Sequence, residues 1–183
     1  MNNFPKNLTV LLEPTAECNL RCRHCYHAKT DYVKNRMSIS TLNKFLKCIA
    51  SYYKDVKIIW HGGEPLLMGY EFFKEAYTLF KQFSAEYNIH FKFGIQTNGT
   101  LLDDDLIDLF VKTNTHISIS FDGIYNDVLR QRTKEVECVI DKLKNRGVEI
   151  SCISTISSAN VSHMKEMYEY FKSLAISVKF NPC

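Results

Sequence analysis

The chain has 183 residues, of which 45% are hydrophobic, and its formal net charge is +3 at pH 7. This length and this hydrophobic content allow one substantial core, so we predict a single domain over residues 1–183. The small net charge and the scattered Lys and Arg side chains argue against nucleic acid as a partner.

The sequence also lacks the signals of a membrane or secreted protein. No apolar stretch approaches the roughly 20 residues that a membrane span requires, and residues 1–6 lack the apolar segment of a signal peptide. Seven cysteines in a chain without such a signal are typical of a reducing compartment rather than of a disulfide framework. We therefore expect a cytoplasmic protein with no membrane partner.

Strand-like and helix-like segments alternate from one end of the chain to the other. Runs of β-branched and aromatic residues predict strands, and apolar residues spaced three and four apart predict helices. In chain order we predict a strand at 8–12, a helix at 40–53, a strand at 56–60, a helix at 68–87, a strand at 91–96, a helix at 103–112, a strand at 116–121, a helix at 133–146, a strand at 148–155, a helix at 162–173 and a strand at 176–180. We interpret Asp103, Asp104 and Asp105 as a helix start and not as a catalytic acid cluster, because carboxylates are favoured at helix N-termini.

The spacing of these elements predicts an α/β fold of the barrel type. Six strands in 183 residues give about 31 residues per unit, the same spacing as an eight-unit barrel of roughly 250 residues. Strands that alternate with helices form parallel sheets through right-handed connections. We therefore predict a partial (β/α)6 TIM-like barrel with a parallel six-stranded sheet and a lateral opening through which a large substrate could enter.

Three cysteines lie within eight residues: Cys18, Cys22 and Cys25. An iron–sulfur cube has four ligand positions, so a loop with three thiolates leaves one iron open to bind something else. A Cys3His zinc site is the alternative, because His24 and His27 lie close by. Structural zinc sites usually take their ligands from two separated pairs, whereas His24 lies inside the cysteine loop. The spacing therefore favours a cluster over zinc.

A second motif follows the predicted strand at 56–60 and contains Gly62, Gly63 and Glu64. Two glycines at the exit of a strand allow a ligand to approach the backbone closely, and a glutamate can accept a hydrogen bond from an ammonium group. A plain strand-to-helix turn is the alternative.

Together the two motifs resemble those of the radical S-adenosylmethionine (radical SAM) enzymes. The segments Gln96-Thr97-Asn98-Gly99 and Ser120-Phe121-Asp122-Gly123 are similar to two further signatures of the SPASM-type subgroup, which includes sulfatase-maturing enzymes and ribosomal-peptide maturases. The resemblance covers nearly the whole chain. It departs from the family at His24, where most relatives carry Phe, Tyr or Trp, and we expect a chain without the C-terminal extension that binds auxiliary clusters in such relatives.

The resemblance implies a 4Fe-4S cluster and S-adenosylmethionine (SAM) as cofactors. The three cysteines would hold three irons, and SAM would bind the fourth through its amino and carboxylate groups. The two glycines and Glu64 would hold the amine, and Arg132 or Arg130 would pair with the carboxylate, which matches the planar fork of a guanidinium. The SAM-binding residues that the resemblance implies are His24, Tyr26, Gly62, Gly63, Glu64, Gln96, Asn98, Ser120, Asp122 and Arg132.

The function that the resemblance implies is hydrogen abstraction. SAM would be cleaved to a 5′-deoxyadenosyl radical, which would take a hydrogen atom from a peptide or protein substrate, with flavodoxin or ferredoxin as electron donor. Because the cofactor carries the difficult chemistry, we expect no dedicated nucleophile or general base and assign no catalytic residue. The four motifs follow the first four predicted strands, which places them at the C-terminal end of the barrel, where barrel enzymes build their sites.

Two alternatives remain open from the sequence. The first is a compact radical SAM enzyme that acts on a small molecule or nucleobase, similar to the deazaguanine-forming synthases. The second is a non-catalytic metal-binding module in which the two glycines only form a turn.

Overall fold

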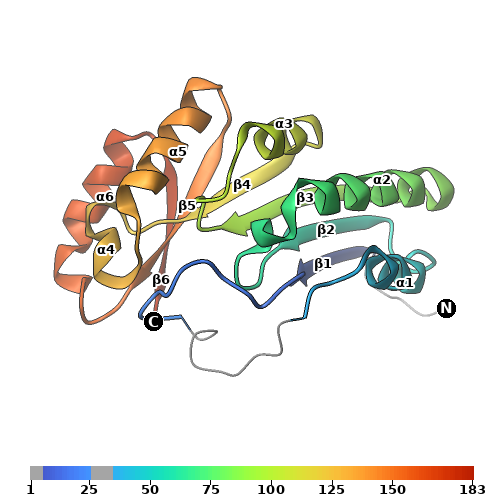
Figure 1. The fold of residues 1–183 in the computed structure, drawn as a ribbon, viewed down its shortest axis with the longest axis horizontal. Helices are drawn as coiled ribbons and strands as arrows, with labels where there is room; N and C mark the ends of the chain where they lie inside the picture. The colour runs from blue at the N-terminus through green and yellow to red at the C-terminus, as the bar shows by residue number, and fades with distance from the viewer. Residues whose placement is uncertain (1–5, 26–34) are drawn as a thin grey trace.

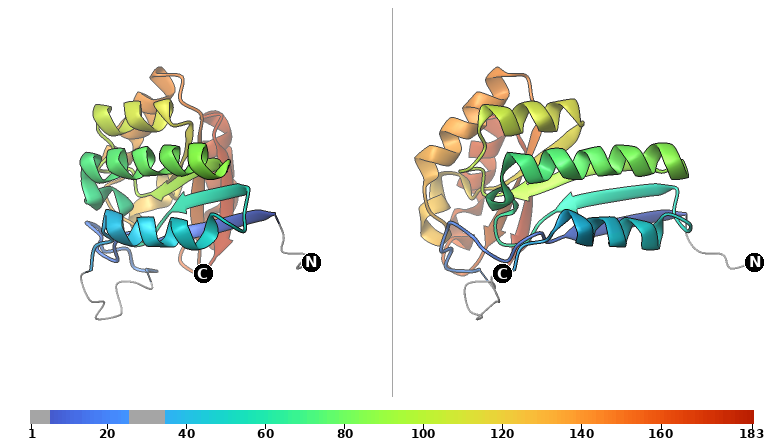
Figure 2. Two further views of the ribbon diagram at one scale, coloured as in Figure 1. Left: turned by 90° about the vertical axis from the view of Figure 1, so that its right-hand side faces the viewer. Right: turned by 45° about the vertical axis from the view of Figure 1, so that its right-hand side comes forward.

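The computed structural model describes residues 6–25 and 35–183. One six-stranded sheet organises the fold, and each strand pairs in parallel with the next along the chain. The sheet curls into a half-barrel that carries helices on its convex side (Figures 1 and 2). The strands are β1 (Asn7–Leu12), β2 (Asp55–Trp60), β3 (His90–Thr97), β4 (Thr115–Ser120), β5 (Ile150–Ile156) and β6 (Ser177–Pro182). The predicted partial (β/α)6 barrel and its parallel sheet are confirmed.

All five predicted helices are present, although some of their ends differ from the prediction. The helices are α1 (Ile39–Ile49), α2 (Gly69–Tyr87), α3 (Asp104–Lys112), α4 (Asn126–Leu129), α5 (Thr133–Asn145) and α6 (Met164–Ser173), with short 3-10 helices η2 (Pro65–Met68), η3 (Gly123–Tyr125) and η4 (Val161–His163). The single turn of α4 was not predicted from the periodicity, because one turn contains too few apolar positions to show it. No helix in the described ranges is both long and apolar enough to cross a membrane.

Side-chain caps fix where two of these helices begin. Ser38 precedes α1, and its hydroxyl accepts a hydrogen bond from the backbone N–H of Thr41. Asp103 precedes α3, and its carboxylate accepts from the N–H of Leu106 at 2.8 Å. These contacts satisfy N–H groups that have no partner within the helix. The interpretation of Asp103 as a helix start is therefore confirmed.

The core lies between the convex face of the sheet and the helices. In β4 the side chains of Ile117 and Ile119 are fully buried, while Ser118 and Ser120 alternate with them on the concave face. Trp60 at the end of β2 packs edge-to-face against Phe73 of α2, with ring centroids 5.5 Å apart. The helices thus cover the convex face of the sheet. The concave face and the C-terminal ends of the strands are left available to bind ligands.

Candidate functional site

The segment that contains the three cysteines follows β1 and runs across the C-terminal end of the half-barrel. The backbone N–H of Arg23 donates to the carbonyl of Leu129 at 2.8 Å, and the N–H of Arg21 donates to the side chain of Gln131 at 3.1 Å. These contacts attach a loop from the first strand to the segment beyond the fourth strand. The motifs that the sequence analysis placed at one end of the barrel are therefore joined in space.

All three cysteines of the loop, Cys18, Cys22 and Cys25, are free and half-buried. Burial raises the pKa of Cys18, and burial also raises the pKa of Cys22, where the positive charge of Arg130 opposes the shift. Among the described residues, no group of three or more His, Cys, Asp or Glu side chains is placed to hold a single metal ion. Tyr26 and His27 lie outside the described residues.

Gly62 and Gly63 are required by the chain's own backbone. Gly62 has a φ of +116°, and a Cβ there would lie 2.5 Å from the carbonyl oxygen of Thr15. A Cβ on Gly63 would lie 2.2 Å from the carbonyl oxygen of Glu17, which is closer than any real contact. Both neighbours belong to the segment that leads into Cys18. The two glycines therefore allow the β1 and β2 exit loops to pack together. The sequence analysis explained the same two glycines by the approach of a ligand to the backbone.

Glu64 is enclosed and fully hydrogen-bonded inside the protein. Its Oε1 accepts from the N–H of Leu66 at 3.0 Å and from the hydroxyl of Thr97 at 2.7 Å, and its Oε2 accepts from the N–H of Asn98 at 2.8 Å. Burial raises the pKa of Glu64, and these three hydrogen bonds oppose that shift. In this structure the carboxylate joins the exit loops of β2 and β3 and positions Asn98.

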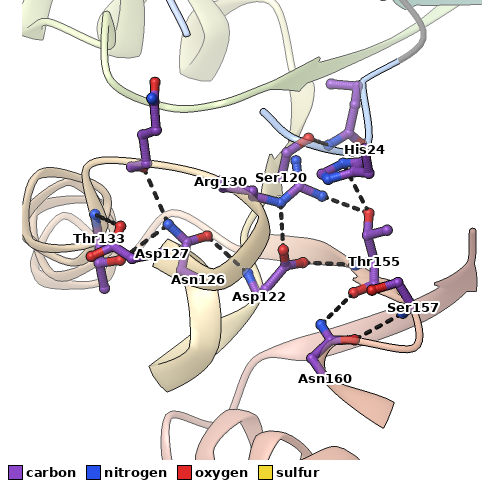
Figure 3. Close-up of polar contacts among 12 residues, drawn as sticks. His24, Ser120, Asp122, Asn126, Asp127, Arg130, Thr133, Thr155, Ser157 and Asn160 are labelled. Carbon is purple, nitrogen blue, oxygen red and sulfur yellow. Dashed lines mark hydrogen bonds and ion pairs between the residues drawn. The ribbon is translucent and has the colours of Figure 1, made fainter. Parts of the chain in front are cut away.

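Asp122 at the end of β4 is a second enclosed carboxylate (Figure 3). It is fully buried, and its Oδ2 forms an ion pair with Nε of Arg130 at 2.9 Å. Its Oδ1 accepts from the backbone N–H of Thr155 at 2.7 Å, and Arg130 Nη2 donates to the Thr155 hydroxyl at 2.9 Å. Asn126 accepts from the Asp122 N–H, and Asn160 donates to the Thr155 carbonyl. Asp122 thus places Arg130 between the ends of β4 and β5.

His24 reaches the same network from the cysteine loop (Figure 3). Its Nε2 lies 3.4 Å from the Thr155 hydroxyl. That hydroxyl also accepts from Arg130 Nη2, and either the hydroxyl or the ring nitrogen can donate in its contact with His24. Burial lowers the pKa of His24, and the nearby Arg130 lowers it further. A backbone hydrogen bond with Leu129 opposes this shift and ties the ring to the segment beyond β4.

The structure distinguishes between the two arginines that the sequence analysis considered. Arg130 is only 10% exposed and lies beside Asp122 and the cysteine loop. Arg132 is 47% exposed, has a left-handed φ of 61°, and pairs with Glu135 in the first turn of α5. Arg132, which the sequence analysis assigned to SAM, therefore lies on the surface, whereas Arg130 lies beside the cysteine loop. The physical reason is that Arg130 fits against a buried carboxylate, which sequence spacing could not reveal.

Gln96 and Ser120 come from neighbouring strands and meet on the concave side. Gln96 Nε2 donates to Ser120 Oγ at 2.8 Å, and both side chains are partly exposed. Sequence reasoning missed Asn19, Thr100 and Thr155, although each is a polar residue in or next to a motif or at the end of a strand. Their hydrogen bonds to other residues of this region, which the sequence does not show, distinguish them from ordinary loop residues.

The donor set at this end of the barrel fits an iron–sulfur cluster. The three half-buried thiols lie close enough to interact electrostatically, because the charges of Cys18 and Cys25 both raise the pKa of Cys22 and the charge of Cys25 raises the pKa of Cys18. Thiolates are the ligands that iron–sulfur clusters take in proteins. The imidazole of His24 and the nearby guanidinium of Arg130 provide polar groups for an organic ligand beside these sulfurs.

Comparison with known proteins agrees with this geometry. The family model for the radical SAM superfamily matches residues 12–171. A serine-type anaerobic sulfatase-maturating enzyme of Bacteroides thetaiotaomicron is 31% identical over 187 residues, which cover 93% of this chain and 45% of that protein. A cysteine-type anaerobic sulfatase-maturating enzyme of Clostridium novyi is 27% identical over 97% of this chain and 52% of that protein. The chain thus spans about half the length of the curated relatives it matches.

Solved structures show the same fold. Native anSMEcpe with bound AdoMet and Cp18Cys peptide superposes with a TM-score of 0.87 at 25% identity, over 97% of this chain and 51% of that one. Streptococcus suis SuiB bound to the precursor peptide SuiA gives a TM-score of 0.69 at 17% identity, over 98% and 39% of the two chains, and so shows the fold alone. On the match of its family model over most of its length, this chain belongs to the radical SAM superfamily, a family of enzymes that use a 4Fe-4S cluster and SAM.

Proposed function

We propose that this chain is the core of a radical SAM enzyme that modifies a peptide or protein. The observation that carries the proposal is the convergence of a three-cysteine loop with Arg130 and His24 at the C-terminal end of the half-barrel. The relatives named as sulfatase-maturating enzymes and the peptide-bound structures of similar fold support a peptide substrate. Free thiols at all seven cysteines support a reducing, cytoplasmic location.

In this proposal Cys18, Cys22 and Cys25 hold three irons of a 4Fe-4S cluster, and SAM binds beside them. When bound, the cluster and SAM together supply the one-electron chemistry that removes a hydrogen atom from the substrate, with flavodoxin or ferredoxin as the electron source. The polypeptide holds these groups in place and keeps water away from them.

Arg130 and His24 are the residues that we assign to SAM first. Arg130 donates from Nε to Asp122 and from Nη2 to Thr155. Within the described residues, no hydrogen bond is found for its third nitrogen, Nη1. This nitrogen is suited to the carboxylate of SAM. The imidazole of His24 is suited to contact the nucleoside, and Gln96 with Ser120 offers further polar groups. Gly62, Gly63, Glu64, Asn98 and Asp122 shape the site through the contacts described above, and a role for Tyr26 stays a prediction.

The proposal is tested by anaerobic reconstitution of the protein with iron and sulfide. The reconstituted protein is treated with dithionite and SAM, and 5′-deoxyadenosine is measured by chromatography. We expect 5′-deoxyadenosine from the wild type and from Cys138→Ala, a control at an exposed cysteine of α5, but none from Cys22→Ala. A protein that binds zinc only, or a cluster that never supports SAM cleavage, would contradict the proposal.

The substrate class requires a separate measurement. Candidate peptides carrying deuterium at their side chains are incubated with the active enzyme and SAM. Transfer of deuterium into 5′-deoxyadenosine would identify a peptide as the hydrogen donor. Transfer only from a small molecule or nucleobase would contradict the peptide assignment and leave the radical chemistry intact.

A further inference from the structure

Asn98 lies directly after β3 and faces the first cysteine of the loop. Its backbone N–H donates to Glu64 Oε2 at 2.8 Å, which fixes the main chain at this point, and its side chain is buried. The side-chain Nδ2 lies 3.9 Å from Cys18 Sγ and 2.9 Å from Asn19 Oδ1. An amide from the third strand therefore reaches the loop that follows the first.

The orientation of this amide is determined by its neighbours. Its Oδ1 accepts both from the backbone N–H of Thr100 at 2.9 Å and from the hydroxyl of Thr100 at 2.7 Å. The same hydroxyl accepts from Asn19 Nδ2 at 2.9 Å, which completes a closed ring of hydrogen bonds. A flipped amide would place two N–H donors against the Thr100 donors and an oxygen against Asn19 Oδ1. The N–H side of Asn98 must therefore face Cys18.

Cys18 Sγ receives a second N–H group from the main chain. The backbone N–H of Leu20 lies 3.4 Å from this sulfur. Two donors aimed at one sulfur favour its negatively charged, ligating form. Hydrogen bonds to ligand sulfurs are among the factors that set the potential of iron–sulfur clusters, because reduction adds negative charge that is shared by the sulfurs.

We infer that Asn98 is a positioning residue that donates a hydrogen bond from Nδ2 to the ligand sulfur of Cys18 and so makes the cluster easier to reduce. This inference rests on the proposed function, because it requires a cluster at Cys18. Asn19 and Thr100 serve the same end by holding the amide in its donating orientation. Cys18 and Asn19 lie on the β1 exit loop and Asn98 and Thr100 on the β3 exit loop, so the arrangement depends on the meeting of these loops at the C-terminal end of the half-barrel.

The test is a redox titration of the reconstituted protein, in which the reduced cluster is measured by electron paramagnetic resonance. Asn98→Ser removes the Nδ2 donor without adding charge, and Asn98→Asp replaces the donor by a negatively charged oxygen. At a fixed potential near the wild-type midpoint, we expect about a threefold lower ratio of reduced to oxidised cluster in Asn98→Ser and a larger decrease in Asn98→Asp. Asn145→Asp adds the same charge at the exposed end of α5 and should leave the ratio unchanged.

A second pair of variants tests the ring without changing Asn98. Thr100→Val removes the hydroxyl that holds the amide, whereas Thr100→Ser retains it, so only Thr100→Val should lower the ratio of reduced cluster. Midpoints equal to wild type in Asn98→Ser and Thr100→Val, with intact clusters, would overturn the inference. If Asn98→Ser binds no cluster, the Thr100 pair decides alone. Failure of the wild type to assemble a 4Fe-4S cluster would instead count against the proposed function.

Discussion

At the scale of single residues, enclosed carboxylates organise the site. Glu64 and Asp122 are both fully buried, and each ties together segments from different strands. A buried charge is costly unless it is paired and hydrogen-bonded, so the partners of these groups are tightly constrained. Their main effect is to place Asn98 and Arg130 beside the cysteine loop.

Replacement of Arg130 should therefore destabilise the fold as well as the site. Arg130→Met leaves the carboxylate of Asp122 buried without its cation, and we expect the free energy of unfolding to fall by about 3 kcal/mol. Arg132→Met removes an exposed pair with Glu135 and should cost at most about 0.5 kcal/mol. Urea denaturation of both variants measures the difference. Equal losses in the two variants would contradict the assignment of Arg130 as the buried partner.

Gly63 provides a second test at this scale. Gly63→Ala would place a methyl group 2.2 Å from the Glu17 carbonyl oxygen, so we expect a loss of about 1–3 kcal/mol and weaker iron binding by the displaced cysteine loop. Gly69→Ala is the control, since its φ of +77° is strained for alanine but no atom lies within 4 Å of the added methyl. The control should lose about 1 kcal/mol in urea denaturation and keep its iron content. Normal iron content in Gly63→Ala would contradict this account of the close approach.

At the scale of whole elements, charged contacts tie the start of α3 to the end of α5. Asp104 forms ion pairs at 2.9 Å with both Lys142 and Arg146, and Arg146 also pairs with Asp108. These contacts lie at the surface, on the outside of the helical layer. The hydrogen bond from Lys142, with the positive charge of Arg146, lowers the pKa of Asp104 below its ordinary value of 3.8.

The lowered pKa predicts a small, pH-dependent contribution from this contact. Because the folded state holds the proton of Asp104 less tightly than the unfolded chain, the stabilisation is present above the unfolded pKa and is lost as the pH falls through the folded value. We expect Asp104→Asn to be slightly less stable than wild type at pH 6, with a difference that disappears at pH 2–3. Chemical denaturation at both pH values measures this. A difference that grows on acidification would have the wrong sign.

At the scale of the whole molecule, aromatic side chains form a continuous core between the sheet and the helices that cover it. Trp60, the single tryptophan of the chain, is fully buried and has ring contacts with Phe72, Phe73 and Phe80. Phe73 also contacts Phe110 of α3, so the packing is continuous from β2 across two helices. A continuous core favours cooperative unfolding of the half-barrel.

Trp60 fluorescence should therefore report on the whole fold. We expect the urea transitions followed by this fluorescence and by far-ultraviolet circular dichroism to coincide. Phe73→Ala should shift both transitions together and lower the free energy of unfolding by about 3–5 kcal/mol, because it leaves a cavity beside Trp60. Two separate midpoints would show that the parts of the half-barrel unfold independently.

The sequence by itself determined the superfamily, the alternation of strands and helices, and the segments that meet at the site. Cysteine spacing and glycine pairs are local patterns, and strand order in a parallel barrel follows the chain, so each of these could be derived without coordinates. Tertiary structure decided which polar groups face which. Arg130 rather than Arg132 lies beside the cysteine loop because Asp122 of the same connection pairs with it, and Asn98 faces Cys18 because Glu64 from the β2 exit holds its backbone. Such contacts join residues 8 to 80 positions apart, and no local pattern in the sequence encodes them.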